Sequence, residues 1–302
     1  MRLHISHDTH YRYPQAVHTA HHLAHLSPPN TPAQTVCTHE LSIWPQPEAD
    51  ALSHRIDGFG NHVCQWQIAS AHDELLVRAS TLVDTHPPEA PRVPDCCWSQ
   101  AAEHYRYISA QHSDAATRFG FASTHVPRSA IFADYAAPSF APGASLVEAA
   151  LDLLARMDAD FDYRPLSTDI HTPAQQALEQ RAGVCQDFAH IMLACLRSLG
   201  LSARYVSGYL LTHAPAGQAR LRGADASHAW LALHVPSATG PGHWLHLDPT
   251  NHRSGWDSPG PDYVVLATGM DFADVSPLRG VLQGGASHEL QVAVTVEPAA
   301  SS

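Results

Sequence analysis

The sequence of 302 residues contains no apolar run that approaches the roughly 18 residues a membrane-spanning helix needs. Positive charge is also scarce, because 17 Lys plus Arg face 29 Asp plus Glu, and the net charge is −12. Such a balance argues against nucleic-acid binding and against anchoring to anionic lipid. We therefore expect neither nucleic acid nor membrane as a partner, and the oligomeric state stays open.

The six cysteines include no CxxC pair, which argues against a structural zinc site. Their odd spacings, and a start without a secretory signal pattern, predict free thiols in a reducing compartment and hence a cytoplasmic location. The 24 histidines include seven within residues 4–25, but in an extended chain a spacing of three does not place side chains on one face. We expect no metal and no cofactor. A His-rich metal-binding protein remains an alternative, and stoichiometric metal after tag-free purification would reveal it.

The chain is long enough for one large or two modest domains. Residues 1–85 alternate between apolar and polar positions in short stretches separated by Pro and Gly, which is typical of a β-sandwich-like domain. The Pro-rich segment 87–94 is the predicted boundary, so we expect an N-terminal domain over 1–86 and a core over 95–298. In the core, helices are predicted at 98–111, 146–157, 172–180 and 185–199. Residues 127–143 are predicted as loop. Strands are predicted at 203–212, 227–235, 243–248, 262–266 and 289–296. Helices followed by an antiparallel sheet define an α+β fold.

Cys185 stands at the start of the predicted helix 185–199. Apolar residues follow it at the spacing of one helical stripe: Ala189, Met192, Leu196 and Leu199. The first turn of a helix offers free backbone N–H groups and the positive end of the helix dipole, both of which favour a thiolate. Asp187 in the same turn works against the thiolate, so the helix alone cannot activate the sulfur and a base is needed.

His228 and Asp248 lie in two alternating stretches joined by a Pro/Ser/Gly loop over 236–242. A hairpin centred near Ala238 places His228 directly opposite Asp248, and such neighbours have Cβ atoms about 4.5–5.5 Å apart. The alternation sorts the leucines onto one face and His228, Trp230 and Asp248 onto the other. We expect the helix that starts at Cys185 to pack against the face that carries His228 and Asp248.

Each of these residues also has a structural explanation when it is considered alone. A cysteine on an apolar helix face is usually a buried packing thiol, and most of the 24 histidines must have other roles. Trp230 and Trp244 are predicted to pack rather than to contact a substrate, because aromatic residues in strands normally supply core area. The combination of a thiol, an imidazole and a carboxylate in paired strands favours catalysis.

Four segments resemble the core blocks of the bacterial transglutaminase-like superfamily, whose members are also described as cysteine proteases. They are GVCQDFAH at 183–190, RYVSGY at 204–209, DASHAW at 225–230 and LDPTN at 247–251. HDTHYRY at 7–13 and DGFGN at 57–61 resemble the β-rich N-terminal region of many bacterial members, and 270–280 resembles their closing block. The resemblance implies a papain-like core with Cys185 as nucleophile, His228 as general base and acid, and Asp248 as the orienting carboxylate.

The predicted chemistry is acyl transfer through a thioester on Cys185, with a peptide or protein amide as substrate. Water as the second nucleophile gives a cysteine protease or amidase that acts on peptide or isopeptide amides, and an amine gives a protein-glutamine transglutaminase. The sequence favours hydrolysis only slightly, because water is always available. A non-catalytic peptide-binding module of the same fold is the other alternative, and the three filled positions count against it.

Overall fold

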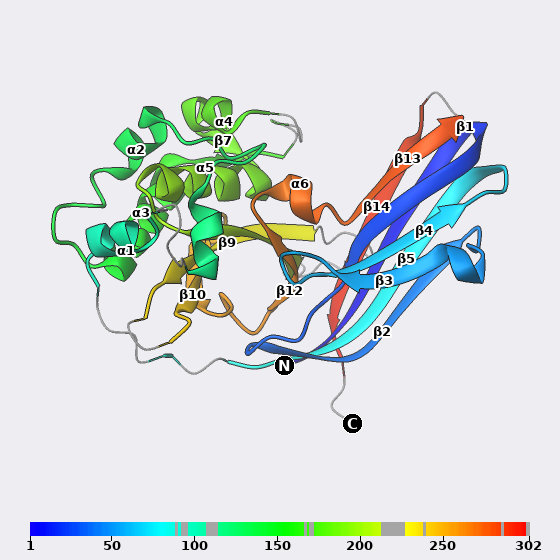
Figure 1. The fold of residues 1–302 in the computed structure, drawn as a ribbon, viewed down its shortest axis with the longest axis horizontal. Helices are drawn as coiled ribbons and strands as arrows, with labels where there is room; N and C mark the ends of the chain where they lie inside the picture. Colours follow the sequence, from blue (N-terminus) through cyan, green and yellow to red (C-terminus); the bar gives the residue numbers. More distant parts are fainter. Residues whose placement is uncertain are drawn as a thin grey trace, which may run out of the picture.

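The structure is a computed structural model that describes residues 1–87, 90–91, 96–106, 114–165, 168, 172–212, 227–237, 240–284 and 287–299. It has a strand-rich part and a core in which helices cover an antiparallel sheet (Figure 1). The predicted α+β class with a β-rich N-terminal region is therefore confirmed. Within the described residues, every helix is too short or too polar to cross a membrane.

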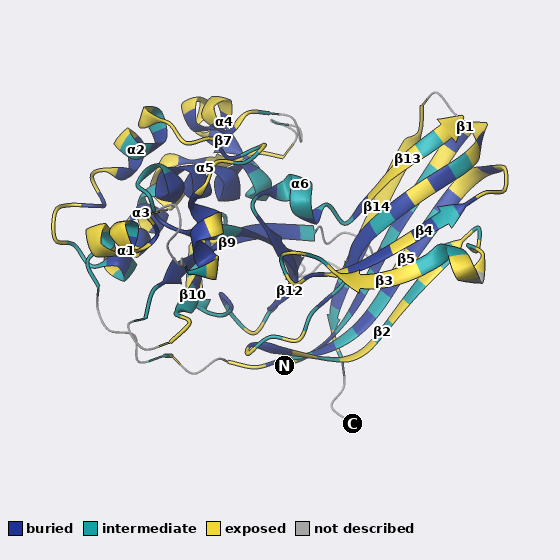
Figure 2. Cartoon of the chain, in the orientation of Figure 1, coloured by how far each residue is buried: buried dark blue, intermediate teal, exposed yellow. Residues whose placement is uncertain are grey.

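The strand-rich part is a seven-stranded antiparallel sheet built around one long strand. Its strands are β1 (Arg2–Ser27), β2 (Gln34–Trp44), β3 (Leu52–Ile56), β4 (His62–Ile68), β5 (His72–Thr85), β13 (Leu278–Gly284) and β14 (Glu289–Pro298), with a short 3₁₀ helix, η1 (Ala49–Ala51), before β3. The first half of β1 pairs with β5 and β14, and its second half pairs with β4 and β13. Trp66 of β4 and Val77 of β5 share one apolar cluster, so the two halves pack on each other as in a sandwich. Buried residues alternate with less buried ones along much of β1 and β5 (Figure 2).

The last two strands correct the predicted domain boundaries. β14 was predicted as a strand of the core sheet, with the core extending to residue 298, but β13 and β14 both pair with β1 of the N-terminal sheet. In Figure 1 these orange and red strands lie beside the blue β1. Alternation along a segment predicts a strand, but it does not identify the sheet that the strand joins.

The core contains α1 (Trp98–His104), η2 (Ala115–Gly120), α2 (Ala130–Ala136), α3 (Leu146–Asp160), β6 (Asp162–Tyr163), α4 (Ala174–Gln180), β7 (Ala182–Gly183), α5 (Cys185–Ser198), β8 (Ala203–Leu210), β9 (Ser227–Val235), β10 (His243–Asp248), β11 (Arg253–Trp256), β12 (Tyr263–Gly269) and α6 (Phe272–Val275). The prediction of loop over 127–143 was wrong where α2 forms, because this short segment carries buried Phe132 and Tyr135. The predicted helix over 98–111 ends at His104, and residues 107–113 lie outside the described residues.

The five-stranded core sheet has the order β11-β10-β9-β8-β12 and is antiparallel throughout. Helix α5 packs on its leucine face, where Met192 shares a cluster with Leu231 and Leu247. The expectation that α5 covers the face with His228 and Asp248 was therefore wrong.

The opposite face of this sheet forms the inside of a curl. Trp230 of β9, Val206 of β8 and Tyr263 of β12 make a separate small cluster there. An ion pair joins Arg253 of β11 to Asp262 beside β12, so the two edges of the sheet come close. Because the inner face has its own apolar filling, the helix packs on the outer one.

Candidate active site

The first residue of α5 is Cys185, which is only partly buried. Asp187, two residues later, turns its carboxylate back to accept from the Val184 N–H at 2.8 Å and the Thr168 hydroxyl at 2.6 Å. A Cβ on Gly183 would lie 2.7 Å from the same Asp187 oxygen, so only glycine fits here. The charge that was expected to oppose a thiolate is thus engaged by two donors, and it caps the helix that presents the sulfur.

His228 and Asp248 meet inside the core. His228 Nε2 lies 2.7 Å from Asp248 Oδ2, and the two residues are 9% and 0% exposed. The Cys185 side chain also lies close enough to His228 to raise the pKa of its imidazole. Since Asp248 occupies Nε2, Nδ1 is the ring nitrogen available to the sulfur. The structure thus brings together all three residues that the sequence singled out.

The register of β9 and β10 that brings His228 to Asp248 differs from the predicted register by two residues. In the observed register His246 pairs with Ala232 and Leu247 with Leu231, so Asp248 comes level with Trp230 and not with His228. The predicted register would have placed Pro241, which has no N–H, opposite Val235 in the ladder. The strands instead close with His243 opposite Val235. A slip of two keeps every side chain on its face, so His228 contacts Asp248 diagonally.

Asp248 accepts three further hydrogen bonds. Its Oδ2 accepts from Asn251 Nδ2 at 2.8 Å and from the Tyr263 hydroxyl at 2.7 Å, and its Oδ1 accepts from the Thr250 N–H at 2.9 Å. Asn251 lies in the LDPTN segment, but sequence reasoning gave it no role. Tyr263 had no local signal at all, because it comes from an edge strand that only the curl of the sheet brings to Asp248.

These contacts set the charge of the pair. Burial lowers the pKa of His228, but the hydrogen bond and charge of Asp248, together with the neighbouring Cys185 side chain, outweigh burial and raise it to about 10. Burial opposes ionisation of Asp248, yet the hydrogen bonds from His228, Asn251 and Tyr263 lower its pKa overall. Burial and the neighbouring carboxylate raise the pKa of Tyr263, so its hydroxyl stays protonated and donates. An imidazolium between a carboxylate and a sulfur is the favoured state.

Trp230 forms a wall behind the imidazole. Its ring stacks on His228 with centroids 5.9 Å apart and meets Tyr263 edge-on at 5.4 Å. Its indole N–H donates to His246 Nδ1 at 2.8 Å, and the residue is fully buried. Trp230 therefore packs, as predicted, and restricts how the ring of His228 can turn.

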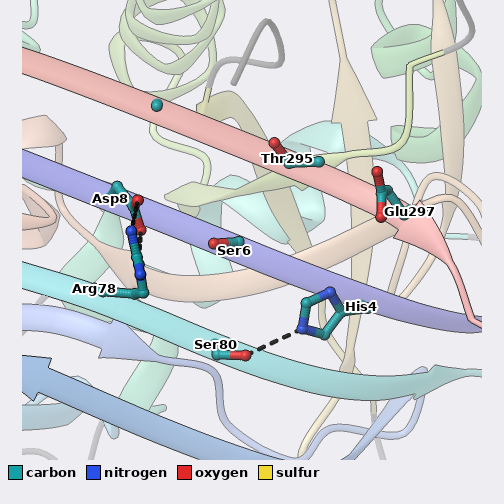
Figure 3. A pocket seen from close by; sticks show the side chains of 8 residues that line it. His4, Ser6, Asp8, Arg78, Ser80, Thr295 and Glu297 are labelled. Carbon is teal, nitrogen blue, oxygen red and sulfur yellow. Dashed lines mark hydrogen bonds and ion pairs between the residues drawn. The ribbon is translucent and has the colours of Figure 1, made fainter. Parts of the chain in front are cut away.

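Other candidate sites lack a comparable set of reactive side chains. In the part of the chain that the structure describes, no three His, Cys, Asp or Glu side chains are arranged to hold a metal ion. A groove of about 470 Å³ lies on the N-terminal sheet (Figure 3). There Arg78 pairs with Asp8 at 2.6 Å, and His4 Nε2 lies 3.0 Å from the Ser80 hydroxyl. These polar groups satisfy one another, so the groove does not rival the cysteine site.

Comparison with known families agrees with this architecture. Residues 3–84 match the bacterial transglutaminase-like N-terminal region, and residues 134–249 match the transglutaminase-like superfamily. The second match contains Cys185, His228 and Asp248. The chain belongs to the transglutaminase-like superfamily.

Three similar proteins illustrate the range of this family. An uncharacterised protein of Mycobacterium tuberculosis is 38% identical over 298 residues, which covers 98% of this chain and 93% of that protein. A protein-glutamine gamma-glutamyltransferase of Pseudomonas aeruginosa is 32% identical over 132 residues, 41% of this chain and 18% of that longer protein. The crystal structure of a candidate cysteine protease from Cytophaga hutchinsonii has a TM-score of 0.71 at 20% identity, and covers 100% of this chain and 92% of its own. This likeness establishes the fold.

We expect Cys185 to react with iodoacetamide at pH 6 faster than the other five cysteines. Burial raises the pKa of the Cys64 thiol to about 11 and of Cys195 to about 12, which protects both. Cys97 is the competitor, because a hydrogen bond with Ser99 lowers the pKa of its thiol. Peptide mapping after brief labelling measures the order. His228→Ala should slow Cys185 and leave Cys97 unchanged, and equal labelling of Cys185 and Cys37 would refute the expectation.

Proposed function

We propose that the protein is a thiol-dependent acyl-transfer enzyme that hydrolyses peptide or isopeptide amides. The observation that carries the proposal is the 2.7 Å contact between His228 and Asp248, with Cys185, at the N-terminus of α5, close enough to the same imidazole to raise its pKa. A thiol, a base and an orienting acid in this relation form the arrangement that nucleophilic acyl transfer requires.

The proposed reaction has two stages. The Cys185 thiolate attacks the substrate carbonyl, and the N–H groups of the first turn of α5 stabilise the oxyanion. His228 gives its proton to the departing amine, and a thioester remains on Cys185. His228 then takes a proton from water as water attacks the thioester, and the carboxylic acid leaves. Asp248 holds the imidazole in the tautomer and orientation that both stages need.

Transfer to an amine is the competing activity, and the local similarity to a protein-glutamine gamma-glutamyltransferase supports its consideration. The two activities differ only in whether water or an amine resolves the thioester. Selection of an amine needs an acyl-enzyme site from which water is excluded. Hydrolysis needs no such exclusion, and we place it first for that reason.

The deciding experiment captures the acyl-enzyme. The protein is mixed with a library of glutamine-containing and isopeptide-containing peptides, quenched in acid and examined by mass spectrometry, with and without a primary amine. We expect an acyl adduct on Cys185, absent in Cys185→Ala, that yields free acid in both samples. Amide product as the main species with added amine would make the transglutaminase reading correct. No adduct from any peptide would favour a non-catalytic binding module.

The composition of the chain helps this experiment. All 17 of its basic residues are arginine, so it has no lysine side chain. Cross-linking of the enzyme to itself through a lysine side chain is therefore excluded.

A further inference from the structure

The DGFGN segment and the edge of the core sheet meet at a contact that the proposed chemistry leaves unexplained. Among the described strands, β12 is one of the two edge strands of the core sheet, and β8 is its only neighbour in the strand order. Its outer side faces the N-terminal domain. An edge strand presents backbone N–H and C=O groups that need partners when they are buried.

Two amide side chains of the N-terminal domain supply those partners. Gln34 donates from Nε2 to the Val265 carbonyl at 2.8 Å and accepts the Val265 N–H on Oε1 at 2.7 Å. Asn61 does the same at Thr268, with 2.8 Å for each bond. Each side chain thus pairs with both backbone groups of one residue, as a neighbouring strand would. Gln34 and Asn61 are 1% and 2% exposed, so water cannot easily replace them.

The turn that carries Asn61 is built to hold it. Asp57 Oδ1 accepts the N–H groups of Phe59 at 2.8 Å and Asn61 at 2.9 Å, and Asp57 Oδ2 accepts from Asn61 Nδ2. Gly60 has φ +89°, a conformation that favours glycine. The DGFGN segment therefore fixes an amide in one orientation, aimed at β12.

Tyr263, at the other end of β12, donates to Asp248 at 2.7 Å. The N-terminal domain is thus linked to the candidate triad in two steps. Gln34 and Asn61 bind the backbone of β12, and Tyr263 of β12 binds Asp248. We propose that Gln34 and Asn61 are positioning residues that fix β12, and that through Tyr263 they hold Asp248 against His228. The inference rests on the proposed role of the triad, and it gives the N-terminal domain a part in setting the reactivity of Cys185.

The physical basis is the geometry that a charged hydrogen bond needs. Tyr263 can hold Asp248 only if its hydroxyl stays within about 3 Å of the carboxylate. β12 has a register shift between Val265 and Ala267 where it pairs with β8, so the ladder on that side is already interrupted. The amides of Gln34 and Asn61 bind β12 on both sides of this irregularity. Their loss should let the strand move and weaken the contact with Asp248.

The test uses full-length Gln34→Met and Asn61→Leu variants, which keep the side-chain volume and remove the paired hydrogen bonds. Two quantities are measured: hydrogen exchange of the Val265 and Thr268 amides, and the rate at which iodoacetamide alkylates Cys185 at pH 6. We expect faster exchange at both amides and alkylation about 3–10-fold slower, in the range of coupling seen for residues that act through others. Tyr209→Phe is the matched control, because it removes the 2.9 Å bond between Tyr209 and His7 that links the two domains and keeps the ring that packs beside Val264 of β12. It should leave the alkylation rate unchanged.

A double-variant cycle separates positioning from general stability. Tyr263→Phe alone should slow alkylation to a similar extent, and adding Gln34→Met to it should have little further effect, because both act through the same contact. The inference would be overturned if the effects of Tyr263→Phe and Gln34→Met on the alkylation rate were fully additive. It would also be overturned if Gln34→Met and Asn61→Leu both alkylated at the wild-type rate. Where an apolar variant does not fold, Gln34→Asn replaces it, since its shorter side chain keeps the polarity but cannot span to Val265. Alkylation needs no amide substrate, so failure of the proposed hydrolysis would be seen separately.

Discussion

Asp248→Asn is expected to lower turnover by about 10²–10³-fold while the fold is retained. An asparagine has the same shape, but its NH₂ cannot accept the hydrogen bonds that Asp248 Oδ2 receives from His228, Asn251 and Tyr263. The imidazole then favours the wrong tautomer. The corresponding change in a serine protease costs about 10⁴ in turnover, and we expect less here because a thiol loses its proton more readily than a serine hydroxyl and depends less on the acid.

The measurement is kcat with whichever peptide forms the thioester, together with the thermal unfolding midpoint. Asp158→Asn is a matched control, because Asp158 is about half exposed and pairs with His252 at 3.3 Å, outside the triad. It should turn over at the wild-type rate. If Asp248→Asn also turned over at the wild-type rate a substrate that Cys185→Ala cannot process, Asp248 would not be the third member of the triad.

Gly208→Ala is expected to destabilise the protein by about 3 kcal/mol or more, at the upper end of the range for overpacking a core. Gly208 lies opposite His228 in the β8–β9 ladder. A Cβ there would lie 2.2 Å from the Val264 carbonyl oxygen and 2.5 Å from the Trp230 ring. The Val264 backbone lies on one side and the fully buried Trp230 ring on the other. Neither neighbour can move to admit the added methyl group.

Urea unfolding of the two proteins measures this loss, and labelling of Cys185 measures its effect on the site, because displacement of Trp230 should also disturb His228. Gly120→Ala serves as the control, since a Cβ at Gly120 would meet its nearest atom, the Leu201 carbonyl oxygen, at 3.6 Å, an ordinary contact. A stability for Gly208→Ala equal to that of Gly120→Ala would contradict the packing described above.

The sequence predicted those parts of the site that local pattern governs. The bounds of β9 and β10 agree with the predicted strands because apolar and polar residues alternate strongly along both. Local pattern also governs the N-cap of α3, because the Ser145 hydroxyl needs only the Glu148 N–H three residues on, which it accepts at 3.3 Å. The segments around Cys185, His228 and Asp248 pointed to residues that the structure brings together.

What the sequence could not predict depends on groups far apart in the chain. The hairpin register was misjudged by two residues, because the strands close with His243 opposite Val235, and the predicted register would have put Pro241 there. The face that α5 covers depends on the curl of the sheet, which no single strand encodes. Tyr263 and Gln34 act on residues 15 and 231 positions away, respectively, so no local spacing could connect them to their partners.

The pairing of β14 with β1 also bears on how the chain folds. Leu3 lies opposite Pro298 and Arg12 opposite Glu289, so the ladder joins residues separated by nearly the whole sequence. Contacts of such long separation form slowly, because a large loop must close before they contribute stability. During synthesis β1 emerges before the core and β14 after it. The sheet that β1 begins can therefore be completed only once the core has been made.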